Sequence, residues 1–350
     1  MKKLVKRICA FSLAAVMLFT MTSCGEDAKF NNIGTTIGNI LNGAEVTSQG
    51  TTTYYIKDGD MYKTNDVKEE GEKIKEGDLS CINITGEKIY YYDNSISTIC
   101  KCNTSGEKVD RIAEIYCDNF VICKDNIYAM VLTGQGSDDM EDPDNYNIVK
   151  MKITDKKLTS TMPKSVAEKG KLLGCIGDNI IVEKNTDTGR AVFKTDLIGE
   201  NESKIMDISK DAKVVGDSKG FMVLGTVDKQ FGLYSYDVNG KNMKLLSKVT
   251  KSKSRDGNAI NMDSEYVYYE DYTANKVIKK NKKNKKNKKV TTSNNLIKIK
   301  RDGSGKEVVM KNSKNMDYKI AIGYNGVMVK IREEGNLDAN PKWIGLKDAK

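Results

Sequence analysis

Short apolar runs, each about the length of a β-strand, recur along the chain and are separated by turn residues. Cys81–Thr85 is followed by the Tyr-rich run Ile89–Asp93, and similar pairs of runs return further along the sequence. Apolar and polar residues alternate in Leu233–Val238 and Leu296–Lys300, which is the period of a strand with one buried face. No long stretch has a convincing helical period. The pattern predicts an all-β protein.

The turns between these runs support that prediction. Asp58-Gly59, Asn239-Gly240, Asp302-Gly303 and Asn325-Gly326 favour tight hairpins, because both turn positions take a positive φ. The unit returns roughly every 35 to 60 residues, and a propeller blade of four strands has about that length. Neighbouring units must stack, because one blade cannot bury both of its faces alone. We therefore expect a β-propeller of about seven four-stranded blades, or six; a large β-sandwich or two smaller β domains are the alternatives.

The start of the chain is typical of an export signal. Lys2, Lys3, Lys6 and Arg7 make it positive, and the apolar run Ile8–Met21 is too short for a comfortable membrane span. We therefore expect the rest of the chain to lie outside the cytoplasm.

The four residues Met21–Cys24 resemble the lipobox of bacterial lipoproteins. The resemblance implies cleavage before Cys24 and a diacylglyceryl, palmitate-type anchor on its thiol; an ordinary signal peptide with a chance cysteine is the alternative. We expect a signal peptide over residues 1–23, the lipidated cysteine and a flexible tether over 24–42, and the propeller over 43–350. The expected location is the cell membrane, lipid-anchored on its extracytoplasmic face.

Several segments carry a further resemblance. Gly38–Gly43, Thr53–Ile56 and Met61–Asn65 look like the opening of a family of uncharacterised bacterial lipoproteins with a domain of unknown function. That domain is similar to the β-propeller of low-density-lipoprotein-receptor-related proteins. Ile89–Asp93 and Val267–Asp271 match its second strand element. The resemblance covers most of the mature chain and implies a propeller fold, but it supplies no catalytic residue.

The chain contains no histidine. This excludes histidine-dependent triads, histidine-based acid–base catalysis and most zinc hydrolase sites. Paired carboxylates, which are the catalytic groups of glycosidases, remain open. We expect no cofactor and no catalytic residue, and we interpret the protein as a binding or interaction module for an envelope or extracellular protein, peptide or polysaccharide. The alternative is an extracytoplasmic glycan-active enzyme that uses paired carboxylates.

The positive charge is concentrated in one segment. The formal net charge of the chain is +9, of which +4 lies in the signal peptide and +8 in the run 279–289, so the remaining body carries −3. We expect this run in a Lys/Asn-rich loop over 276–294, inserted between two strands. Its lysines could contact an anionic wall polymer or lipid headgroups, or the run is only a low-complexity insertion. Without an aromatic residue in the run we expect no specific nucleic-acid binding. The candidate residues are Lys279, Lys280, Lys282, Lys283, Lys285, Lys286, Lys288 and Lys289.

An acidic loop over residues 137–145 is the second expected insertion. Its carboxylates are weak candidates for Ca²⁺ ligands, because their spacing does not match the calcium loop of an EF-hand. We prefer a solvated loop without a metal. The carboxylates are those of Asp138, Asp139, Glu141, Asp142 and Asp144.

Six cysteines fall within the expected propeller. In an exported protein they could pair as disulfides, or they could remain buried thiols that pack as small apolar residues. The sequence leaves both options open, and it contains no Cys-x-x-Cys pair that would indicate a redox or zinc site. The six are Cys81, Cys100, Cys102, Cys117, Cys123 and Cys175.

Overall fold

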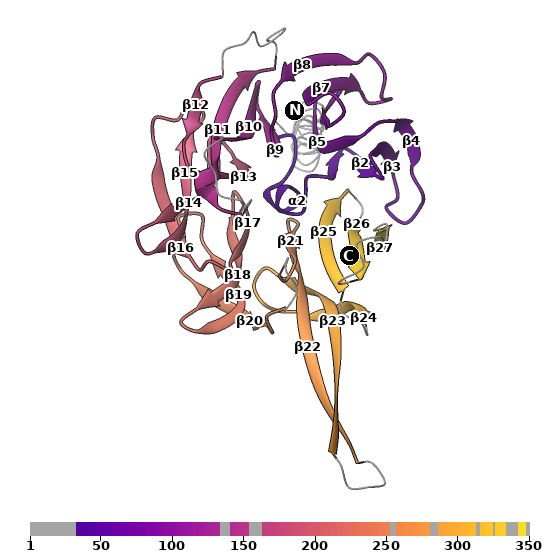
Figure 1. Cartoon of the computed structure of the whole chain (residues 1–350), viewed down its shortest axis with the longest axis vertical. Helices are drawn as coiled ribbons and strands as arrows, with labels where there is room; N and C mark the ends of the chain where they lie inside the picture. Colours follow the sequence, from indigo (N-terminus) through magenta and orange to yellow (C-terminus); the bar gives the residue numbers. More distant parts are fainter. Residues whose placement is uncertain are drawn as a thin grey trace, which may run out of the picture.

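The strands form seven antiparallel sheets arranged as blades around a common axis (Figure 1). The computed structural model describes residues 33–133, 141–153, 163–252, 257–280, 286–312, 316–324, 326–333 and 342–347. Six sheets have four strands in chain order, and the seventh has three described strands. The prediction of an all-β propeller with about seven blades is confirmed. No helix in these described ranges is long and apolar enough to cross a membrane.

The first three blades contain strands β1 to β12. Blade 1 holds β1 (Val46–Gln49), β2 (Thr52–Lys57), β3 (Asp60–Thr64) and β4 (Glu72–Lys75). Blade 2 holds β5 (Leu79–Thr85), β6 (Lys88–Asp93), β7 (Thr98–Asn103) and β8 (Asp110–Glu114). Blade 3 holds β9 (Asn119–Cys123), β10 (Asn126–Leu132), β11 (Tyr146–Lys152) and β12 (Ser165–Ala167), with the short 3₁₀ helix η1 (Pro143–Asn145) before β11.

The other four blades contain strands β13 to β27. Blade 4 holds β13 (Lys171–Ile176), β14 (Asn179–Thr186), β15 (Gly189–Asp196) and β16 (Ser203–Ile208). Blade 5 holds β17 (Lys213–Asp217), β18 (Gly220–Val227), β19 (Gln230–Tyr236) and β20 (Lys244–Lys248). Blade 6 holds β21 (Ile260–Met262), β22 (Tyr266–Lys280), β23 (Lys286–Lys300) and β24 (Glu307–Asn312). Blade 7 holds β25 (Met316–Gly323), β26 (Gly326–Glu333) and β27 (Lys342–Lys347).

The core lies between the blades, and the tyrosines of β6 show how it forms. Tyr91 packs with Ile56 and other residues of blade 1, whereas Tyr90 and Tyr92 pack with Phe120 and other residues of blade 3. Successive residues of a strand point to opposite faces of the sheet, so one run of tyrosines fills two interfaces. A central strand of each blade is therefore apolar on both faces.

The ring has two faces with different turns. The first strand of each blade lies next to the axis, where the short helix α2 (Ile37–Leu41) contacts β13, β17, β21 and β25 (Figure 1). We call the face where the first and third strands of each blade end the N-terminal face. The opposite face carries the turns after each second strand and the connections between blades. Val46, the first residue of β1, begins near this opposite face.

Candidate functional site

The axis of the ring is occupied by the chain itself. Residues 33–45, which we call the axial segment, begin where Ile33 forms a β-bridge with Cys123 on the N-terminal face. The N–H of Gly34 donates to the carbonyl of Ile122 at 2.8 Å, and the N–H of Ile82 donates to the carbonyl of Ala44 at 2.7 Å. The segment thus runs along the axis from one face to the other. The expectation of a flexible tether through residue 42 is wrong for residues 33–42, whereas residues 24–32 lie outside the described residues.

Buried asparagines hold the axial segment in place. The side-chain amide of Asn39 donates to the carbonyls of Val46 and Ile322, both at 3.0 Å, and its oxygen accepts the N–H of Ile322 at 2.8 Å. The amide of Asn261, on the inner strand of blade 6, donates to the same Asn39 oxygen at 3.0 Å. Asn42 donates to the carbonyl of Ile260 at 2.9 Å. These amides satisfy backbone groups that an open axis would expose to water.

Apolar contacts fill the rest of the axis. Ile37 is buried against Leu173 of blade 4 and Phe221 of blade 5. A β-carbon on Gly174 would lie 2.7 Å from Cγ1 of Ile37, so blade 4 needs a glycine where the segment passes. Thr36 caps α2 by accepting the N–H of Asn39 at 3.1 Å. The axial segment is therefore an integral part of the core.

Ionic groups gather where the axial segment leaves the ring on the opposite face. Glu45 pairs with Lys330 at 2.6 Å and lies 4.0 Å from Lys319, both from blade 7. Asp118, at the start of blade 3, accepts the hydroxyl of Tyr146 at 2.6 Å. Burial and the Asp118 carboxylate raise the pKa of Tyr146 above its ordinary value, so the hydroxyl keeps its proton and the hydrogen bond at neutral pH.

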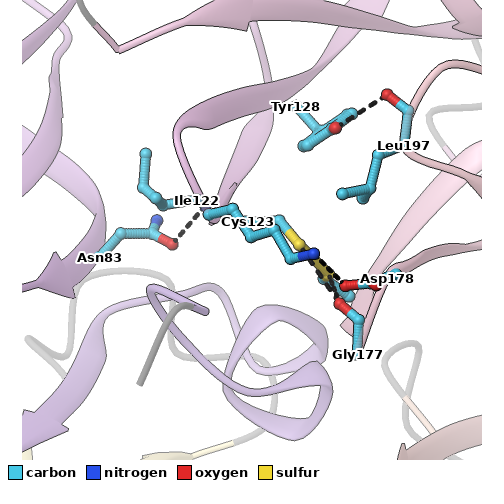
Figure 2. Close-up of a disulfide and its surroundings, with 9 residues drawn as sticks. Asn83, Ile122, Cys123, Tyr128, Gly177, Asp178 and Leu197 are labelled. Atoms are coloured by element: carbon cyan, nitrogen blue, oxygen red, sulfur yellow. Dashed lines mark hydrogen bonds and ion pairs between the residues drawn. A yellow bond between two sulfur atoms is a disulfide. The ribbon is translucent and has the colours of Figure 1, made fainter. Parts of the chain in front are cut away.

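A disulfide joins blades 3 and 4 close to the axis. Cys123, at the end of β9, is bonded to Cys175 of β13 (Figure 2). Next to it, Lys124 forms an ion pair with Asp178, and the hydroxyl of Tyr128 donates to the carbonyl of Leu197 at 2.9 Å (Figure 2). The sequence left the pairing of the six cysteines open, and this pair lies on the inner strands of consecutive blades.

The other four propeller cysteines are free and buried in the structure. Burial raises the pKa of Cys81 to about 12 and that of Cys102 to about 11. The protonated thiol therefore predominates at neutral pH, and a thiol is a poor nucleophile compared with its thiolate. Cys100 and Cys117 are likewise buried thiols, and burial raises the pKa of each. All four pack as small apolar residues of the blade interfaces.

Two carboxylates are buried within the described residues, and they lie on different blades. Glu183 of β14 pairs with Arg190 at 2.9 Å; burial raises its pKa, while the arginine opposes that shift. Glu270 of β22 accepts the amide of Asn294 at 2.6 Å and the N–H of Ala259 at 3.2 Å. Each therefore has its own neutral or cationic partner and does not face another buried carboxylate.

The described part of the acidic loop is tied to blade 4. The carboxylate of Glu141 pairs with Lys171, and Asp142 accepts the side-chain amide of Asn185 at 2.8 Å. Residues 138–139 lie outside the described residues. The Glu141 side chain stays 76% exposed and the hydrogen bond to Asp142 lies at the surface, so these two carboxylates remain solvated while blade 4 offers them a cation and an amide donor.

No group of three metal-ligating side chains comes together anywhere in the described ranges. Asp144 lies in η1, where its N–H donates to Asp142 at 3.0 Å. A calcium site that includes residues 138–139 stays an untested prediction, as does the lipidation of Cys24, which also falls outside the described residues.

The Lys/Asn-rich run forms strands in place of the expected loop. β22 and β23 pair without interruption from Tyr266↔Lys300 to Lys280↔Lys286 and project from the ring as a two-stranded arm (Figure 1). We call residues 276–290 the lysine ribbon. Lys279 pairs with Asn287, and the pairs on either side of it, out to Lys276↔Val290, also contain at least one lysine. The register set inside the blade continues outward without a bulge, so the backbone groups of the ribbon pair with each other.

The lysine ribbon extends well beyond the blade. β21 pairs with β22 only as far as Tyr269, and β24 pairs with β23 only as far as Asn294, which lies opposite Tyr272. The next eight residues of β22, up to Lys280, therefore pair only with β23 and extend about 27 Å at the usual rise of a strand. Of the candidate lysines, Lys279, Lys280, Lys286, Lys288 and Lys289 have described backbone, and Lys282, Lys283 and Lys285 lie outside it.

The axial segment is the feature that the sequence analysis missed. Its glycines and asparagines favoured a tether, but Ile33, Ile37, Ile40 and Leu41 follow the i, i+3, i+4 spacing of a buried helical face. The close approach of Gly38 to blade 6 was not detectable in the sequence. A β-carbon on Gly38 would lie 1.8 Å from the side-chain oxygen of Asn261.

No protein-family model matches the sequence, and no curated protein matches it. Solved structures do match the fold. An acylaminoacyl peptidase from Pyrococcus horikoshii has a TM-score of 0.55 at 10% identity, over 90% of this chain and 53% of that chain. An oligogalacturonate lyase from Vibrio parahaemolyticus has a TM-score of 0.52 at 11% identity, over 84% and 85% of the two chains.

A structure of a nidogen/laminin complex matches at a TM-score of 0.42 and 11% identity, over 72% of this chain and 90% of that chain. The two matches with a TM-score above 0.5 show the propeller fold, and at such identities they carry no information on activity. The fold that the sequence resemblance implied is therefore confirmed, and membership of that lipoprotein family stays a prediction.

Proposed function

We propose that this protein is a lipid-anchored, extracytoplasmic binding module. Its propeller holds an envelope or extracellular ligand, and its lysine ribbon contacts an anionic polymer at the cell surface. The anchor is the Cys24 thiol. The single observation that carries the proposal is the ribbon, in which a strongly basic run is presented on paired strands about 27 Å beyond its blade.

The charge distribution supports a polyanion as the contact. The run 279–289 within the ribbon carries a charge of +8, whereas the rest of the body has a net charge of −3. Lysine side chains bind phosphate as mobile point charges and need no fixed geometry, which suits an extended polymer of repeating phosphates. Release of condensed counterions from such a polymer favours binding and makes it weaken steeply with salt. The axial segment fills the axis, which leaves the ends of the ring and the ribbon as surfaces for a ligand.

The ribbon is tested by two variants of the full chain. In one, residues 276–290 are replaced by Asn-Gly, which closes the hairpin at the Asn275↔Thr291 pair. In the other, the eight lysines are changed to glutamine and the length is kept. The probes are poly(glycerol phosphate) and neutral dextran of equal length.

The unaltered protein should bind poly(glycerol phosphate). If about seven lysines make contact, its affinity for this polymer should fall by a factor on the order of 10³ between 50 and 200 mM salt. Both variants should lose this binding and keep their stability within about 0.5 kcal/mol. Binding of the glutamine variant at the strength of the unaltered protein would overturn the polyanion proposal. Dextran binding that survives in both variants would indicate a separate ligand surface on the ring.

The anchor is tested in cells. Cys24→Ser should abolish labelling by palmitate, because one cysteine carries the acyl chains. Ser23→Ala is the matched control, since it keeps a small residue next to the cleavage site and should keep the label. Palmitate labelling that persists in Cys24→Ser would contradict anchoring through this residue.

A further inference from the structure

The position of Ile33 limits where the anchor can lie. Ile33 pairs with Cys123 on the N-terminal face, and the axial segment then runs away from that face. Nine Cα–Cα steps separate Cys24 from Ile33 in the sequence, so the two residues are at most about 32 Å apart whatever the conformation between them.

A route from Ile33 to the opposite face is longer than this. From the inner to the outer strand of a blade, three strand spacings add up to about 14 Å. The seven residues of β10, in the blade that Ile33 contacts, run from one face to the other and add about 23 Å. A path around the rim therefore needs about 37 Å before it reaches the opposite face. The acyl chains on Cys24 therefore cannot reach a bilayer at the opposite face, whereas a bilayer at the N-terminal face is within their reach.

Exposed apolar side chains gather on the same face. Val109, Ile198, Val238, Met243 and Tyr324 all lie in turns of the N-terminal face, on blades 2, 4, 5 and 7, and each is 40% or more exposed. Within the described ranges, the turns and connections of the opposite face hold two exposed large apolar residues, Ile96 in blade 2 and Tyr116 in the connection between blades 2 and 3. An apolar side chain at the tip of a turn makes little contact with its own blade and is free to contact another surface.

Side-chain to backbone hydrogen bonds hold two of the turns that carry these residues. The side chain of Asp237 accepts the N–H groups of Asn239 and Lys241, both at 2.9 Å, which fixes the turn around Val238. In the equivalent turn of blade 4, Asp196 accepts the N–H of Ile198 at 3.1 Å. Rigid tips lose little conformational entropy when they contact a surface.

We propose that the N-terminal face of the propeller docks on the lipid bilayer that holds the anchor. The exposed turn residues reach the headgroup region, and the opposite face, with Glu45 and Asp118, points away from the membrane. The inference rests on the proposed lipid anchor at Cys24 and goes beyond it by fixing the orientation of the ring. Tyr324 suits this position, because a tyrosine places its apolar ring and its polar hydroxyl at the boundary between lipid and water.

The turns of the N-terminal face carry charges of both signs. Lys108 and Lys241 lie near Glu107 and Asp237, so an anionic surface gains little there. The apolar tips, held close to the bilayer by the anchor, make the contact. The probe is therefore a vesicle of pure phosphatidylcholine. Its lipids carry no net charge, so binding to it does not depend on attraction between lysines and anionic headgroups.

Photocross-linking from paired positions tests the orientation. The full-length lipidated protein is reconstituted into phosphatidylcholine vesicles with benzoylphenylalanine at one position. Tyr324 on the N-terminal face, 49% exposed, is compared with Tyr116 on the opposite face, 61% exposed. Val238 and Ile96 form a second pair on the two faces, each 40% exposed. Lipid adducts are counted by mass spectrometry after irradiation.

We expect at least a tenfold excess of lipid adducts at Tyr324 over Tyr116 and at Val238 over Ile96. Equal yields, or an excess on the opposite face, would overturn the docking while the protein still floats with the vesicles, so the anchor would stand. Flotation of the mature protein that does not depend on acylation of Cys24 would remove the anchor and the docking together. Circular dichroism of each variant checks that the ring is intact, and the second pair gives the result if a variant of the first pair fails to fold.

Discussion

Gly106 of blade 2 lies directly against the carbonyl oxygen of Ile74 of blade 1: a β-carbon on Gly106 would be only 2.0 Å from that oxygen. Gly106 has φ +81 in the turn between β7 and β8, and Ile74 belongs to the outermost strand of the preceding blade. The outer turn of one blade thus closes on the last strand of its neighbour. The same contact recurs for Gly199 on Val166 (2.5 Å) and for Gly240 on Ile205 (2.2 Å).

Gly106→Ala should therefore lower the free energy of unfolding by about 3 kcal/mol. Alanine is strained at this positive φ, and its β-carbon would displace the outer strand of blade 1. Gly86→Ala is the control within the same blade. Its φ is +58, but no atom lies within 4 Å of the position of its β-carbon. Gly86→Ala should lower the free energy of unfolding by only about 1 kcal/mol, which is the cost of placing alanine at a positive φ. Urea unfolding measures the free energy of unfolding of both variants. Equal decreases would show that the strand of Ile74 moves away from the new β-carbon without a loss of stability.

The axial segment should contribute directly to stability. Asn39→Ala removes the side-chain partner of the carbonyl and of the N–H of Ile322 and one of two side-chain donors to the carbonyl of Val46. Leaving such groups unpaired should cost about 3 kcal/mol in urea unfolding. Asn201→Ala is the control, because Asn201 is exposed and donates one side-chain hydrogen bond, to Asp196. A loss below about 1 kcal/mol for Asn39→Ala would mean that water replaces its hydrogen bonds.

The bond between Cys123 and Cys175 closes a loop with a sequence separation of 52 residues. Constraining the unfolded chain to this extent should contribute about 2–4 kcal/mol. The double variant Cys123→Ala, Cys175→Ala should unfold at lower urea and be insensitive to dithiothreitol, whereas the unaltered protein should be sensitive to it. Alkylation of the unfolded, unreduced propeller should modify only the four free thiols. Modification of all six would refute the bond.

Asp211 should make part of the stability pH-dependent. Burial alone would raise its pKa, but hydrogen bonds from Lys251, Ser209 and Thr226 outweigh burial and lower the pKa to about 2. In the unfolded chain an aspartate titrates near pH 4. Because the folded pKa is the lower one, the contribution is complete above about pH 4 and is lost as the pH falls toward 2.

Asp211→Asn should therefore cost on the order of 1 kcal/mol at pH 7, since the group is partly solvated, and much less at pH 2.5. Guanidinium unfolding of both proteins at the two pH values measures the change. A difference between the proteins that is the same at pH 7 and pH 2.5 would show that the charge of Asp211 does not stabilise the fold.

The repeating strands and turns were predictable because their causes are local. The alternation in Leu233–Val238 and the turn dipeptide Asn239-Gly240 depend on neighbours a few residues away, and the structure places β19 and its turn there. The candidate lysines were also recognisable from composition. Their arrangement on paired strands was not, because it depends on the register that Tyr266↔Lys300 sets within the blade.

The class of the protein follows from local patterns in the chain, which indicate repeated four-stranded β units with one basic insertion and no histidine chemistry. What closes the axis and which cysteines pair depend on the assembled ring. Asn39 meets Asn261, and Cys123 meets Cys175, after the blades have assembled into a ring. The ring brings residues that are far apart along the chain to the axis, and no local pattern in the sequence records that approach.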